Sequence, residues 1–102
     1  MDYTPTYDQH NRFNKLINQL EAIKEDLNSF NREHKAKHGT SHFKAYNLSS
    51  EIYQKIQDYK AEFSRRFSNK EEVINKLSNS VKYYQELAER VKREKPITTS
   101  SL

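Results

Sequence analysis

Three histidines near the middle of the chain have a spacing that could do chemistry. His34, His38 and His42 are four residues apart, and two imidazoles at i and i+4 on one helix face can chelate Zn²⁺ or Cu²⁺. The same residues also suit a polar helix end, where a cationic side chain lies favourably in the helix dipole. The sequence leaves both interpretations open, so we assign these histidines no metal and the chain no cofactor.

The motifs of the common kinds of catalysis are missing from the sequence. The chain has no Cys and a single Gly, which excludes thiolate chemistry and the glycine-rich loops that cradle phosphates. It has no Glu-x-x-His pair of the kind that builds a di-iron bundle. We therefore expect a protein that is not an enzyme.

Basic residues gather around the first expected turn and at the end of the last expected helix. In an up-down-up bundle both clusters lie at one end, and we name this set the basic pole: Arg32, Lys35, Lys37, Lys44, Arg90, Lys92 and Arg93. Such a pole could bind nucleic acid, with Phe43 and Tyr46 stacking on bases. Because the dipole also favours cations at helix C-termini, nucleic-acid binding is the alternative function here and not the first.

Aromatic residues predict the leading function. Tyr53 and Tyr83 lie beside the apolar stripes of their helices, and half-exposed tyrosines are good interface anchors. Phe43 and Tyr46 are expected to fold back over one end of the core and to add to this interface. The sequence thus favours a small protein-binding module, an adaptor, inhibitor or assembly subunit, that binds another protein or a second copy of itself.

Composition and periodicity determine which elements must position these residues. Only one Gly and two Pro punctuate 102 residues, of which 33% are hydrophobic and 31% charged, with a net charge of +4. Sheets need more turns than this, so the fold is expected to be all-α. One stripe has steps of three and four, which is the spacing of a coiled-coil seam: Phe13, Leu16, Leu20, Ile23, Leu27 and Phe30.

Capping signals predict three helices in an up-down-up bundle with coiled-coil-like seams. The first runs from about Pro5 to His34, or a little beyond, with Thr6 and Gln9 as a competing capping box and Gly39 as the stop. The second begins at Asn47 or Ser49 and ends near Phe67. The third begins near Asn69 and ends before Pro96. Residues 1–95 then form one domain, and 96–102 a disordered tail.

One alternative concerns the second turn. No Gly or Pro separates Asn47 from Pro96, so residues 48–95 could form a single long helix of a helical hairpin. Arg66 and Lys70 would then lie on the apolar seam, which is unfavourable for charged side chains. Ser68 and Glu71 also have the spacing of a capping box, which predicts a new helix start. We therefore favour a break at Ser68.

The N-terminal sequence and the hydropathy indicate where in the cell the protein is expected. Met1 is followed by neither a basic region nor an apolar one, which argues against a signal peptide. No window has the apolar length that spans a bilayer. We expect a cytoplasmic protein without a membrane span, although secretion without a cleaved signal stays open.

Overall fold

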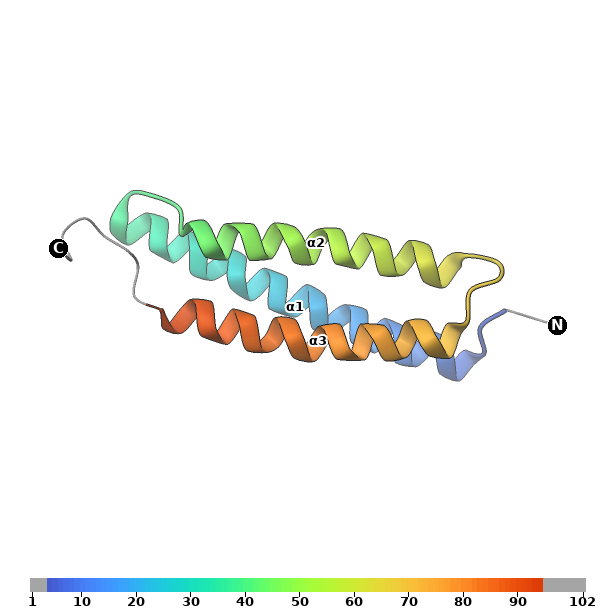
Figure 1. Ribbon diagram of the computed structural model, residues 1–102. Coiled ribbons are helices and arrows are strands. Elements are labelled where there is room, and N and C mark those ends of the chain that lie inside the picture. Colours follow the sequence, from blue (N-terminus) through green and yellow to red (C-terminus); the bar gives the residue numbers. More distant parts are fainter. Residues whose placement is uncertain (1–3, 95–102) are drawn as a thin grey trace.

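Three antiparallel helices make up the fold. A computed structural model describes residues 4–94, in which α1 (Tyr7–His38), α2 (Phe43–Ser64) and α3 (Lys70–Arg93) run up, down and up, and each packs against both others (Figure 1). The bundle measures 62 × 18 × 17 Å. The all-α three-helix bundle predicted from the sequence is confirmed. The predicted disordered tail, 96–102, lies outside the described residues.

Local chemistry determines where α1 begins and ends. Thr6 is its N-cap: its hydroxyl accepts from the Gln9 N–H at 3.1 Å, and the Gln9 side chain accepts from the Thr6 N–H at 3.0 Å. The helix therefore starts at the capping box and not at Pro5. At the other end Gly39 adopts φ +76° and donates its N–H to the Lys35 carbonyl at 2.8 Å. Gly39 is the predicted stop, but α1 continues one turn beyond His34.

The turn between α2 and α3 excludes the single long helix. α2 ends at Ser64, and Asn69 caps α3 by accepting from the Glu72 N–H at 3.1 Å. The predicted capping box of Ser68 is wrong, because the Ser68 hydroxyl donates to the Arg65 carbonyl at 3.0 Å instead. Phe67, expected near the end of the second helix, lies in this turn and is exposed.

Lys70 closes the same turn from inside. Its side chain is only 7% exposed, and its ammonium donates to the Phe63 carbonyl at 2.7 Å, the Arg65 carbonyl at 2.6 Å and the Ser68 hydroxyl at 2.7 Å. Carbonyls at a helix C-terminus lack hydrogen-bond donors within the helix. The Lys70 ammonium is the donor for these carbonyls. Lys70, which would be unfavourable on a continuous apolar seam, thus binds the end of α2.

The start of α2 also differs from the prediction. The helix begins at Phe43, one turn before Asn47, because the His42 imidazole acts as N-cap and accepts from the Ala45 N–H at 3.2 Å. Phe43 and Tyr46 therefore occupy the first turn of a helix and point outwards. They do not fold back over the core, which corrects the expectation from the sequence.

The core lies along the axis of the bundle and is closed by this one chain. Leu20, Leu27, Ile52, Ile56 and Leu77 are fully buried, and the rings of Phe13 and Phe63 stack at 4.0 Å between centroids. Within the predicted seam, Leu16, Ile23 and Phe30 are only half-buried, whereas Ile17 beside it is buried. The stripe of α1 is thus wider than a strict seam, since α1 packs against two helices at once.

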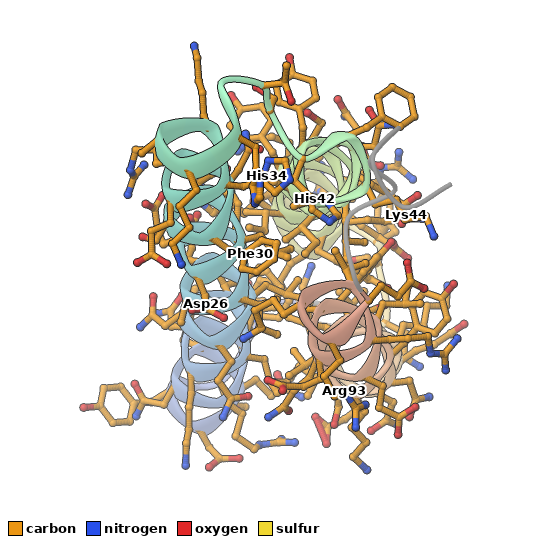
Figure 2. All side chains as sticks on the ribbon, turned by 90° about the vertical axis from the view of Figure 1, so that its left-hand side faces the viewer. Asp26, Phe30, His34, His42, Lys44 and Arg93 are labelled. Atoms are coloured by element: carbon orange, nitrogen blue, oxygen red, sulfur yellow. The ribbon has the colours of Figure 1, made fainter. Side chains whose placement is uncertain are left out.

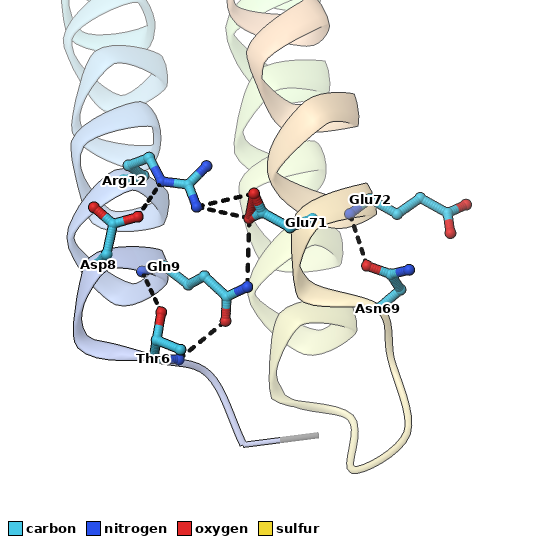
Figure 3. A network of polar contacts seen from close by, with 7 residues as sticks. All are labelled: Thr6, Asp8, Gln9, Arg12, Asn69, Glu71 and Glu72. Atoms are coloured by element: carbon cyan, nitrogen blue, oxygen red, sulfur yellow. Dashed lines mark hydrogen bonds and ion pairs between the residues drawn. The ribbon is translucent and has the colours of Figure 1, made fainter. Parts of the chain in front are cut away.

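A polar network joins the first turns of α1 and α3 (Figure 3). The Arg12 guanidinium donates to both Glu71 carboxylate oxygens, at 3.0 and 2.7 Å, and to Asp8 at 2.8 Å. Hydrogen bonding to Arg12 lowers the pKa of Glu71. The network connects α1 and α3 at the end of the bundle that holds the α2–α3 turn.

No helix within residues 4–94 combines the length and the apolar character needed to cross a membrane.

Candidate functional site

Large aromatic side chains project from the outer face of α2. Phe43 is 76% exposed, Tyr46 58% and Tyr53 54%. At 100° per residue they fall within about 80° of one another around the helix axis. We call these three residues the aromatic stripe. The buried residues of α2 lie on a different face, so the stripe is not a part of the core that is incompletely covered.

The stripe runs beside α1. The Lys24 ammonium of α1 lies 5.5 Å from the centre of the Tyr53 ring, a cation–π geometry. Glu21 and Glu25 hold that ammonium at 2.9 and 3.7 Å. The pKa of Lys24 is raised, chiefly by the hydrogen bond to Glu21. Tyr53 is therefore held in place from a neighbouring helix.

Tyr83, the fourth predicted interface residue, does not join the stripe. It lies on α3, where its ring contacts that of Tyr84 at 5.1 Å. Lys76, one heptad earlier on the same helix, pairs with Glu62 of α2 at 3.4 Å, which places Tyr83 along the edge of α3 that borders α2. Tyr53 borders α1 instead, so the structure brings together Phe43, Tyr46 and Tyr53 and leaves Tyr83 apart.

The residues of the basic pole lie at the end of the bundle that holds the α1–α2 turn, where Figure 2 labels Lys44 and Arg93. Carboxylates pair with part of the pole. Lys44 pairs with Glu94 at 2.5 Å, and Lys92 pairs with Asp26 and, at 3.3 Å, with Glu89. The side chains of Arg32 and Arg93 are also engaged, with the Ser29 hydroxyl and the Glu89 carbonyl. Within residues 4–94 these ion pairs make the pole a mixed surface.

The three histidines form one cluster beside the turn between α1 and α2: His34 and His38 belong to the last turns of α1, and His42 caps α2. The ring centroid of His34 lies 4.6 Å from that of His38 and 5.0 Å from that of His42, and we call the three residues the histidine cluster. His34 and His42 lie between α1 and α2 in Figure 2. The Nδ1 atom of His34 bonds the Thr40 carbonyl at 2.8 Å. The backbone N–H of His42 donates to the side-chain oxygen of Asn31 at 2.6 Å.

These contacts give the histidine cluster a structural task. His42 is only 7% exposed, and burial, followed by the nearby His34, lowers its pKa. Nowhere in residues 4–94 do three or more His, Cys, Asp or Glu side chains meet in a geometry that could hold a metal ion. The i,i+4 spacing brings the imidazoles together, as expected, and their contacts connect the turn to both helices.

Comparisons with protein-family models, curated proteins and solved structures gave no match to this chain.

Proposed function

We propose that this chain is a non-catalytic protein-binding module whose contact surface is the aromatic stripe on α2. The observation that carries the proposal is the exposure of Phe43, Tyr46 and Tyr53 on a bundle whose core is already closed. Grouped apolar surface on a folded domain marks interaction sites, and tyrosines are enriched among the residues that dominate binding energy.

The stripe is also well suited to binding because it is rigid. Its residues stand on a helix that is packed against α1 and α3 and capped by His42. Side chains held in place before binding lose less conformational entropy when a partner docks. The partner is a helix or another extended apolar surface that covers the stripe, and a second copy of this chain meets that description as well as a different protein does.

Nucleic-acid binding is the less favoured function because carboxylates pair with cations of the basic pole. Phe43 and Tyr46 flank Lys44 in the sequence, but Lys44 is paired with Glu94. Lys92 is likewise held by Asp26 and Glu89. A phosphate that approached these cations would have to displace a carboxylate, and this lowers the gain from counterion release.

The experiment compares which proteins of the native host are captured by the full tagged chain and by three variants of it. The double variant Tyr46→Ala/Tyr53→Ala removes two rings from the stripe, while Tyr7→Ala and Tyr83→Ala remove exposed rings elsewhere. We expect the double variant to lose a captured protein by at least about tenfold, since truncating an interface aromatic costs about 2 kcal/mol. The two single variants should retain it.

Self-association and nucleic-acid binding are measured separately with the same variants. Light scattering over a concentration series reports whether the captured partner is a second copy, in which case the double variant should remain monomeric. Binding to random DNA and RNA is measured in a salt series. Salt-sensitive binding that Lys35→Gln/Lys37→Gln abolishes and the stripe variant leaves intact would refute the proposal.

A further inference from the structure

The hydrogen bonds of the histidine cluster determine where each ring can carry a proton. His34 Nδ1 faces the Thr40 carbonyl at 2.8 Å. A carbonyl only accepts, so Nδ1 donates and the lone pair of the neutral ring lies on Nε2. His42 has the opposite arrangement: its Nδ1 faces the Ala45 N–H at 3.2 Å and must accept. The His42 ring is therefore neutral in the closed turn, because a protonated Nδ1 could not accept from Ala45.

A further proton disrupts the arrangement at His42, because it binds Nδ1 and removes the acceptor that caps α2. The surroundings of His42 offer this charge little compensation. The ring centroid of His34 lies 5.0 Å from that of His42, and His38 lies 4.6 Å from His34. His34 Nε2 is buried and has no hydrogen-bond partner among the described residues.

We propose that the histidine cluster is an acid-sensitive lock on the α1–α2 turn, which is closed while the His42 imidazole is neutral and opens more readily when this ring binds a proton. The part released comprises Gly39–His42 and the first turn of α2. The proposal is independent of the protein-binding function above, because it concerns the equilibrium of the chain alone.

The groups around His42 support this direction. From α1 it faces His34, with His38 beside it, and the edge of the Phe30 ring at 5.2 Å. Lys44 of α2 disfavours a proton on His42, whereas Glu94 at the end of α3 favours one. Because Lys44 and Glu94 pair at 2.5 Å, their effects partly cancel. Burial is the largest cause and lowers the pKa of His42, as does the neighbouring imidazole; a backbone hydrogen bond raises it, and the net shift is downwards.

The sign of the pH effect follows from this lowered pKa. Consider a histidine whose pKa is lower in the closed state than in the open state. The full stabilisation of the closed state is present at pH values above the pKa of the open state, which is about 6.5. This stabilisation is lost as the pH falls below about 6.5 towards the closed-state pKa. With one linked proton, the closed-to-open ratio falls by up to about tenfold between pH 7.5 and 5.5.

The test uses amide hydrogen exchange and histidine NMR on the full chain. The Ala45 and Tyr46 amides report directly, because they donate to the His42 side chain and to its carbonyl. Their protection factors should fall by about three- to tenfold from pH 7.5 to 5.5. The His42 ring resonances should titrate with a midpoint below about 6.5.

Two variants separate the lock from other effects of acid. In His42→Asn the amide oxygen can still cap α2 but does not titrate, so the pH response of Ala45 and Tyr46 should disappear. His10→Asn changes a histidine at the far end of the bundle, where the ring packs on Phe63, and should keep the response. An unchanged response in His42→Asn, or a His42 midpoint at or above about 6.5 in the unmodified chain, would overturn the proposal. If His42→Asn fails to fold, the His42 midpoint decides alone.

Discussion

Replacing Lys70 by Met tests how the α2–α3 turn is held. Met keeps most of the apolar stem of Lys and removes only the ammonium. The change therefore leaves the buried volume almost intact and removes three hydrogen bonds, to the Phe63 carbonyl, the Arg65 carbonyl and the Ser68 hydroxyl. The ammonium also lies 5.6 Å from the centre of the Phe63 ring.

The expected loss follows from these contacts. A hydrogen bond to a charged group is worth about 1.5–3 kcal/mol, but the three bonds share one ammonium and do not add. Removing the ammonium also removes the cost of burying it, which offsets part of the loss. The Phe63 carbonyl is left at the end of α2 without this donor. We expect the free energy of unfolding to fall by about 2–3 kcal/mol.

Urea titration followed by circular dichroism measures this change, and thermal unfolding gives a second estimate. For a domain of this size, a loss of about 2–3 kcal/mol lowers the melting temperature by roughly 8–24 °C. Lys60→Met is the matched control, since Lys60 is an exposed residue of α2 and its substitution should change stability by less than about 0.5 kcal/mol. Equal stability of Lys70→Met and Lys60→Met would refute the idea that Lys70 holds the turn.

Two further pairs of substitutions test the core and the α1–α2 turn. Leu20 is fully buried and Leu16 half-buried, so Leu20→Ala should lower the free energy of unfolding by about 3 kcal/mol or more, and Leu16→Ala by clearly less; similar losses in urea titrations would contradict the assigned core. Gly39 has φ +76°, and a Cβ added there would meet no neighbouring atom within 4 Å, so Gly39→Ala should cost about 1–2 kcal/mol through backbone strain alone. Gly39→Asn should cost less, because Asn tolerates this conformation, and equal melting temperatures for the two variants would count against that reason.

Local signals in the sequence are enough for much of the fold. The period of the stripe containing Leu20 and Leu27 depends only on helical geometry, and it predicts an amphipathic helix without knowledge of the partners. The stop at Gly39 is equally local, since glycine adopts positive φ without strain. The break before α3 is predictable because Arg66 and Lys70 are unfavourable on a continuous seam.

The features that sequence reasoning misses depend on contacts between segments. His42 is not among the preferred N-cap residues, and it caps α2 because Phe30, His34 and Asn31 surround it. Nothing in the sequence near His42 signals this. Lys70 contacts the carbonyl of Phe63 across the turn, which becomes visible only when the turn has been built.

The candidate site is predictable in the same partial way. Tyr53 is a candidate because it lies beside its stripe, and this reasoning needs only the helical period. Phe43 and Tyr46 are candidates as part of a loop covering the core, and they are exposed for a different reason, since α2 starts one turn earlier than expected. The interface role of all three residues stays a prediction.

The position of the histidine cluster relative to the aromatic stripe separates the two proposals in a measurable way. Phe43 follows His42 directly and Tyr46 lies in the same turn of α2, whereas Tyr53 is two turns further along and is held by Lys24 of α1. Opening of the α1–α2 turn would therefore remove the helical geometry of Phe43 and Tyr46 and leave Tyr53 in place. A partner that depends on Tyr46 should lose affinity at acid pH, and one that depends on Tyr53 should not. The lock can thus be correct while the stripe binds nothing, and the stripe can bind a partner without any response to pH.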